Sequence, residues 1–186
     1  DDQRKQLISK TIAAFGRIDI LVNNAATNPV YSPIEEIDPV IFDKIMEINV
    51  KAPWALSNLV LPHLQANKNG SIINIASVEA LTPGYGLGVY STSKAAILML
   101  TKNQAKEWGA YGIKVNAICP GLIKTKFSAA LWQNEKMLHK LEKSIPSGRM
   151  GKPEEMVGLA CLLASNAGNY MTGGVYTADG GYMIAG

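Results

Sequence analysis

Residues 70–94 read GSIINIASVEALTPGYGLGVYSTSK, and this stretch decides the fold of the 186-residue chain. The run 71–76 is short, mostly apolar and rich in isoleucine, which is typical of a parallel strand buried on both faces. A glycine-rich loop over 83–88 follows, and the pattern then predicts a helix over 89–108. A buried strand that leads through a loop into a long helix indicates an α/β protein.

The same alternation extends in both directions from this stretch. Short apolar runs predict three further strands, over residues 19–23, 113–119 and 175–178. Apolar spacing and capping residues predict helices over 3–15, 39–64 with a bend at Pro53, and 153–165, with helical insertions in 123–150. Strands that alternate with long helices predict a doubly wound parallel α/β sheet with right-handed crossovers.

The strand over 19–23 is expected to lie at an edge of this sheet. It is apolar and contains no lysine or proline, the residues that usually protect a sheet edge from other chains. We therefore expect strands from before Asp1 to pair with it. The chain starts without Met and carries no signal peptide, so it is expected to be a processed product or a fragment.

The composition excludes several classes of protein. With 47% hydrophobic and 18% charged residues, the chain is that of an ordinary globular protein. The net charge of +3 comes without a basic run, so no nucleic-acid partner is expected, and no apolar stretch is long enough to span a membrane. Cys119 and Cys161 lack disulfide or zinc spacing, and both are expected to be buried. No targeting signal is recognisable, so the cytoplasm is the expected location.

Three polar side chains in the deciding stretch can act together. Tyr90 and Lys94 are four residues apart, so they share a helix face and the ammonium can approach the phenol. A cation within about 4–6 Å favours the phenolate and lowers the pKa of a tyrosine. Ser77 ends a strand at the edge where doubly wound sheets bind ligands, and its hydroxyl can donate to a carbonyl oxygen. The three predict acid/base chemistry on a carbonyl or alcohol.

Other interpretations stay open for these and neighbouring residues. Taken alone, a Tyr-x-x-x-Lys pair is a common chance arrangement on a helix. Glu79 is expected to be a solvated loop carboxylate, with a position facing the substrate as the alternative. The apolar residues of 127–141 form either a substrate lid or amphipathic helices packed on the sheet. Neither histidine has the spacing of a metal ligand, so no metal site is expected.

Further motifs occur in the same order as the strands. Asn49 lies 28 residues before Ser77 on an otherwise apolar helix. The strand ends carry Asn23-Asn24-Ala25-Ala26, Pro120-Gly121-Leu122-Ile123-Lys124-Thr125 and Asp179-Gly180-Gly181. Together with Ser77, Tyr90 and Lys94, this set resembles the short-chain dehydrogenase/reductase family of nicotinamide-dependent oxidoreductases over essentially the whole chain. Residues 24–29 and 120–128 are more narrowly similar to its carbonyl/retinal-reductase branch.

The resemblance implies a role for each matching position. Tyr90 resembles the family's proton donor and acceptor, Lys94 the residue that lowers its pKa, and Ser77 the carbonyl-orienting serine. Asn49 resembles the asparagine whose backbone holds a water of the proton relay. The implied cofactor contacts are Asn23 and Ala25 on the adenosine-ribose side, Tyr90 and Lys94 at the nicotinamide ribose, and Pro120, Gly121, Ile123 and Thr125 at the carboxamide and phosphates.

The resemblance also implies a fold, a cofactor and partners. Residues 1–186 are expected to form one catalytic-half, NAD(P)-binding domain of the Rossmann-type three-layer α/β/α fold, with a small-molecule carbonyl or alcohol substrate. Homodimers or homotetramers are implied as well. The family's opening Thr-Gly-x-x-x-Gly-x-Gly loop has no match, so the first βαβαβ half is expected to be lacking and the choice of NAD or NADP is left open. The alternative is a catalytically silent fragment that only folds and self-associates.

Overall fold

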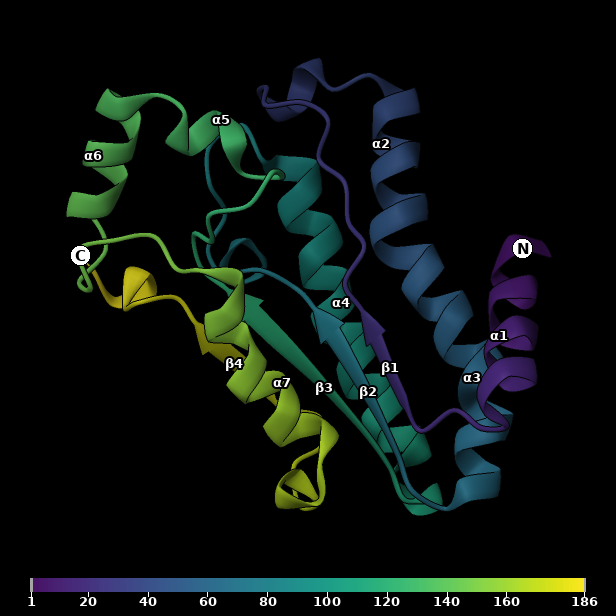
Figure 1. The fold of residues 1–186 in the computed structure, drawn as a ribbon. Helices are drawn as coiled ribbons and strands as arrows, with labels where there is room; N and C mark the ends of the chain where they lie inside the picture. The colour runs from purple at the N-terminus through teal and green to yellow at the C-terminus, as the bar shows by residue number, and fades with distance from the viewer. Residues whose placement is uncertain (1, 186) are drawn as a thin grey trace.

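A computed structural model describes residues 2–185 as a parallel sheet with helices on both faces (Figure 1). The strand order is β1-β2-β3-β4, and every neighbouring pair is parallel, so the predicted α/β class and the four strands are confirmed. All strands therefore end at the same edge of the sheet. Their bounds are β1 Ile20–Asn23, β2 Gly70–Ile75, β3 Ile113–Pro120 and β4 Val175–Ala178.

The helices follow the predicted order along the chain. One difference concerns the long second helix, which is interrupted by a π-helical turn over Glu47–Lys51, just before Pro53, where a bend was expected. Asp38 begins this helix as expected, because its carboxylate accepts a hydrogen bond of 2.7 Å from the Val40 amide. The bounds are α1 Asp2–Phe15, α2 Pro39–Met46, α3 Ala52–Asn67, α4 Gly88–Trp108, α5 Ala129–Trp132, α6 Glu135–Lys143 and α7 Val157–Ala164.

The two faces of the sheet are covered by different helices. On one face, α1, α3 and α4 pack against Ile72 of β2 and Val115 of β3. On the other face, Leu163 of α7 packs against Ile73 and Ile118. Successive residues of a strand point to opposite faces, so Ile73 faces away from its neighbour Ile72. In Figure 1, α4 and α7 accordingly lie on opposite sides of the strands. The three-layer α/β/α arrangement is therefore present.

The handedness of one crossover differs from the prediction. The strand order advances in one direction from β1 to β4, and the connections through α3 and α4 cross one face of the sheet. The connection from β3 to β4 crosses the opposite face, through α7. Its hand must therefore be opposite to that of the first two crossovers. The prediction that all crossovers share the usual right hand is wrong for the last one.

Strand β1 lies at the edge of the described sheet, as predicted. Leu21 packs on the face covered by α1 and α3, but Ile20 and Val22, which point to the face of α7, are 46% and 48% exposed. Two expectations of burial are wrong. Phe15, placed by spacing on the apolar face of α1, is 77% exposed, and Cys161 is exposed on α7, whereas Cys119 is buried.

Truncating Leu163 to alanine is expected to lower the free energy of unfolding by about 2–5 kcal/mol. This side chain is fully buried and packs in one cluster with Ile73 of β2 and Ile118 of β3. Urea unfolding followed by circular dichroism measures the loss. The matched control is Leu162→Ala, at a neighbouring position that is 37% exposed, where the loss is expected to stay near 1 kcal/mol or below. Equal losses in the two variants would contradict this packing.

Candidate active site

Ser77 lies at the edge of the sheet where the parallel strands end. It follows β2 and caps the short 3-10 turn Val78–Ala80, where its Oγ accepts a hydrogen bond of 3.1 Å from the Glu79 amide. The Ser77 side chain is about nine-tenths buried. Its Oγ is the acceptor in this bond, so the hydroxyl proton can be donated to another oxygen.

Tyr90 lies in the first turn of α4, where the chain returns from the glycine-rich loop to the sheet. It is 9% exposed, and burial raises the pKa of its phenol to about 12. A hydrogen bond with Ser77 acts in the opposite direction, and the nearby charge of Glu79 adds to the rise in pKa. At neutral pH the phenol is therefore protonated, beside the Ser77 hydroxyl.

Lys94 lies where helical spacing placed it, but the pKa of Tyr90 is raised in this structure and not lowered. Its ammonium is 5.7 Å from the centre of the Tyr90 ring and donates a hydrogen bond of 2.8 Å to the Ile75 carbonyl. Burial of the phenol is the largest cause of this raised pKa. Burial also lowers the pKa of Lys94 to about 8, an effect that nearby Cys119 partly opposes.

Asn49 connects three parts of the site. It is 1% exposed within the π-helical turn, and its Nδ2 donates to the Thr27 carbonyl and to Ser93 Oγ, both at 3.0 Å. Its Oδ1 accepts from the Thr27 amide at 2.8 Å. Ser93 in turn donates to the Tyr90 carbonyl at 2.7 Å. The asparagine thus joins the loop after β1 to the helix that carries the tyrosine.

Asn23 ends β1, but its side chain points into the interior. Its Nδ2 donates to Asn74 Oδ1 at 2.8 Å and to Ser57 Oγ at 3.3 Å. Its Oδ1 is buried without a hydrogen-bond partner among residues 2–185. Ala25, two residues further along, is exposed.

The segment after β3 is tightly held at the same edge of the sheet. Gly121 donates to the Ala178 carbonyl at 3.0 Å, and a Cβ there would come within 2.7 Å of the Asp179 Cα, so only glycine fits. The Ile123 side chain is partly buried and packs against Gly151. The Thr125 carbonyl accepts a hydrogen bond of 2.9 Å from the Trp132 indole.

These residues fit one end of a nicotinamide dinucleotide. A buried ammonium, a phenol and the fixed turn at Gly121 meet at the edge of the sheet, where they can contact a ribose and a carboxamide. The described strand ends carry no glycine-rich turn of the kind that binds a pyrophosphate at a helix N-terminus. The glycine-rich loop before α4 has other contacts. In this loop the Gly86 carbonyl accepts a hydrogen bond of 3.1 Å from the Ser32 amide.

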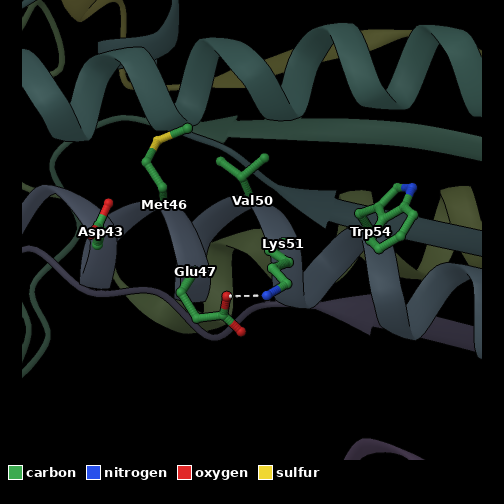
Figure 2. A pocket seen from close by; sticks show the side chains of 6 residues that line it. All are labelled: Asp43, Met46, Glu47, Val50, Lys51 and Trp54. Carbon is green, nitrogen blue, oxygen red and sulfur yellow. Dashed lines mark ion pairs between the residues drawn. The ribbon is translucent and has the colours of Figure 1, made fainter. Parts of the chain in front are cut away.

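Two hollows on the described surface differ in their relation to this site. The larger lies on α2 and the start of α3, where the Glu47–Lys51 ion pair of 3.0 Å and the half-exposed Trp54 line it (Figure 2). No residue of the predicted catalytic set lines it. A smaller cavity at the ends of β3 and β4 is lined by Ile123 and Asp179, among others, and so adjoins the predicted cofactor contacts.

Two neighbours of Tyr90 are not among the predicted catalytic or cofactor-binding residues, although a position facing the substrate was the alternative for Glu79 and a substrate lid one alternative for residues 127–141. Glu79 is not a solvated loop carboxylate, because its Oε2 accepts hydrogen bonds from the Gly84 amide and the Ser91 hydroxyl. Phe127 contacts Tyr90, with ring centres 6.1 Å apart, and is 58% exposed. In the sequence, the position of Glu79 two residues after Ser77 was the one indication that it lies at the site. Nothing in the spacing of Phe127 indicated this contact.

Comparisons with known proteins show the family to which the chain belongs. A family model described as enoyl-(acyl carrier protein) reductase matches residues 1–183. Dehydrogenase/reductase SDR family member 4 of Oryctolagus cuniculus is 39% identical over 97% of this chain and 69% of its own length. The Homo sapiens protein of that name is 36% identical over 97% and 65%. This chain therefore spans about two thirds of the length of these relatives.

A solved structure is similar over the whole chain. A gluconate 5-dehydrogenase from Burkholderia cenocepacia J2315, in complex with NADP and tartrate, superposes with a TM-score of 0.95 and 33% identity. The matched region covers 100% of this chain and 72% of the Burkholderia cenocepacia chain. Within residues 2–185, no helix has the length and apolar character needed to cross a membrane.

Proposed function

The chain belongs to the short-chain dehydrogenase/reductase family, and we propose that it transfers a hydride between a nicotinamide cofactor and a carbonyl or secondary alcohol. The observation that carries the proposal is the buried Tyr90 phenol beside Ser77, with the Lys94 ammonium on the same face of α4. The hydride donor or acceptor is the nicotinamide ring when the cofactor is bound.

Ser77 and Tyr90 act on the substrate oxygen. The Ser77 hydroxyl orients the carbonyl, since its own Oγ accepts from the Glu79 amide and leaves its proton for the substrate. Tyr90, with a pKa of about 12, carries its proton at neutral pH and donates it to the oxygen during reduction. Alcohol oxidation requires the reverse transfer, for which the phenol must first lose its proton.

Lys94 and Asn49 assist the proton transfer by Tyr90. Lys94 has a pKa of about 8, so at neutral pH its ammonium is charged and stabilises negative charge on the phenol oxygen during the transfer. Asn49 is committed through its side chain to Thr27 and Ser93, so its part in a water relay belongs to its main chain. The side chain fixes the place of that main chain next to α4.

We assign the cofactor as NAD or NADP, and NADP is the first to test because the Burkholderia cenocepacia structure holds it. Lys94 and Tyr90 would hold the nicotinamide ribose. The turn after β3 would hold the carboxamide and phosphates through Pro120, Gly121, Ile123 and Thr125, with Ile123 acting by its backbone. Asn23 and Ala25 would line the adenosine-ribose side, Asn23 by its main chain because its amide is turned inward.

The substrate is a small-molecule carbonyl compound with an apolar or aromatic group, as for a carbonyl reductase. Phe127 supports this assignment, because its exposed ring lies against Tyr90 where such a group would pack. The contact also favours a substrate lid over simple packing on the sheet for this part of the insertion. A homodimer or homotetramer in the cytoplasm completes the proposal, and residues 1–186 would act as one domain.

Titrating NADPH and NADH into this chain, with cofactor fluorescence as the signal, tests the proposal. Saturable binding of at least one of them below about 1 mM is expected. Reduction of an aromatic ketone is then followed at 340 nm. If neither cofactor binds up to that concentration, the oxidoreductase assignment fails for this chain, and the alternative of a silent, self-associating fragment replaces it.

A further inference from the structure

Glu79 joins the segment of residues 81–87, which contains most of the glycine-rich loop and ends where α4 begins, to the helix that carries Tyr90. Its Oε2 accepts a hydrogen bond of 2.6 Å from the Gly84 amide in the loop and one of 3.2 Å from Ser91 Oγ in α4. Ser91 is 5% exposed and directly follows Tyr90. A single carboxylate oxygen therefore fixes the loop relative to the first turn of α4.

The same residue also contacts Ser77. Its amide donates to Ser77 Oγ at 3.1 Å, so Glu79 touches the carbonyl-orienting serine through its main chain and the neighbour of the tyrosine through its side chain. The carboxylate lies close against the loop, because a Cβ added at Gly84 would be 3.0 Å from both of its oxygens. Glycine at position 84 permits this approach.

The loop has a second attachment on its other side. The Gly86 carbonyl accepts from the Ser32 amide at 3.1 Å, and the Tyr31 ring lies within 2.8 Å of where a Gly86 Cβ would be. Gly86 has a φ of +76°, which favours glycine. Glu79 thus provides the attachment nearest to Tyr90, and Ser32 the one that faces the loop after β1.

The charge of Glu79 is not neutralised by an ion pair with any of residues 2–185. Two neutral donors hold it, the Gly84 amide and the Ser91 hydroxyl. The charged or titratable groups around the phenol are Glu79 from the 3-10 turn, Lys94 from α4, and Cys119 from β3 next to Lys94. Glu79 is the acid among them whose charge acts on Tyr90.

We propose that Glu79 is a positioning residue, whose carboxylate fixes the 81–87 loop against Ser91 and thereby sets the place of the Tyr90 phenol beside Ser77. The inference rests on the proposed role of Tyr90. It assigns to Glu79 no contact with substrate or cofactor.

Amide hydrogen exchange and NMR test this role without cofactor or turnover. In Glu79→Ala, exchange at Gly84 and in the rest of the loop is expected to rise by about tenfold or more, because a charge-assisted hydrogen bond is lost. In protein labelled with ¹³C-tyrosine, the Cζ resonance of Tyr90, assigned by its loss in Tyr90→Phe, is expected to shift. Glu79→Gln keeps an acceptor oxygen and is expected to restore most of the protection at Gly84.

The matched control is Glu107→Ala, which removes an exposed carboxylate from the far end of α4 and is expected to change neither signal. Unchanged exchange over 81–87 in Glu79→Ala would show that the carboxylate does not hold the loop, and the proposal would be overturned. Faster exchange with an unmoved Tyr90 resonance would also overturn it, because Glu79 would then hold only the loop. If both signals change in a chain that proves inactive, the positioning role stands and the proposed oxidoreductase function fails.

Discussion

Tyr90→Phe is expected to lower kcat/KM for carbonyl reduction by about 10²–10⁴-fold, the usual contribution of a general acid. Phenylalanine keeps the ring that packs against Phe127 and removes only the hydroxyl that gives the proton. Steady-state kinetics with a saturating cofactor measure the loss. Cofactor binding by the variant is expected to stay within a few-fold of the wild-type chain, because most of the proposed cofactor contacts are unchanged.

The control for this substitution is Tyr170→Phe, since Tyr170 is fully exposed and lies outside the site. It makes the same chemical change and is expected to leave kcat/KM unaltered. Urea unfolding should show that Tyr90→Phe changes stability by no more than about 1 kcal/mol, the scale of one buried hydrogen bond. A variant that folds normally and keeps its turnover would remove Tyr90 from the mechanism.

Lys94→Met is expected to abolish measurable turnover and also to change how stability depends on pH. Lys94 is 3% exposed, and its pKa falls from 10.5 in the unfolded chain to about 8 in the folded one. Between these values the unfolded chain binds more protons, so the free energy of unfolding of the wild-type chain rises with pH. Below about pH 8 both states carry the charge, and the folded state bears the full cost of its burial, on the order of 3 kcal/mol.

Methionine fills a similar volume without a charge, so this rise between pH 8 and 10.5 should be missing from the variant. It also leaves the Ile75 carbonyl without its donor, at a cost of about 1–3 kcal/mol, so stability at pH 7 is expected to change little. Cys119 has a raised pKa and acts in the opposite sense above about pH 9. Because the charge of Lys94 is one of the causes that lower the thiol pKa, the comparison is cleanest between pH 8 and 9, below the range in which the thiol titrates.

Urea unfolding at several pH values, with wild type and variant compared at each, measures this difference. The control is Lys102→Met, because Lys102 is an exposed lysine of the same helix. Its curve is expected to run parallel to that of the wild-type chain. If the Lys94→Met curve also runs parallel, the ammonium is not buried as described.

Local features of the sequence were sufficient for much of the fold and for the choice of site residues. The apolar runs identified all four strands, and Asp38 with Pro39 located the start of α2. The four-residue spacing of Tyr90 and Lys94 correctly placed both on one face of α4. These features depend on periodicity and capping within a few residues, and such interactions can be read directly from sequence.

Features that depend on neighbours distant in sequence could not be read in this way. The π-helical turn in the second helix contains Asn49, whose partners Thr27 and Ser93 come from two other segments, whereas proline rules pointed to a change at position 53. The last crossover takes the less common hand because Leu163 packs on the face that α3 and α4 leave open. The general preference for right-handed crossovers does not predict this exception.

The α/β class, the order of the strands along the chain and the side chains at the carboxyl ends of the strands could all be predicted from local sequence patterns. The charge states and contacts of those side chains depend on the packing of the whole molecule. Burial raises the pKa of Tyr90, against the lowering that a neighbouring ammonium predicts, and Glu79 is drawn in by the Gly84 amide and Ser91. The reason is that solvation and hydrogen-bond partners are set by everything packed around a group, whereas spacing along the chain fixes only which groups share a face.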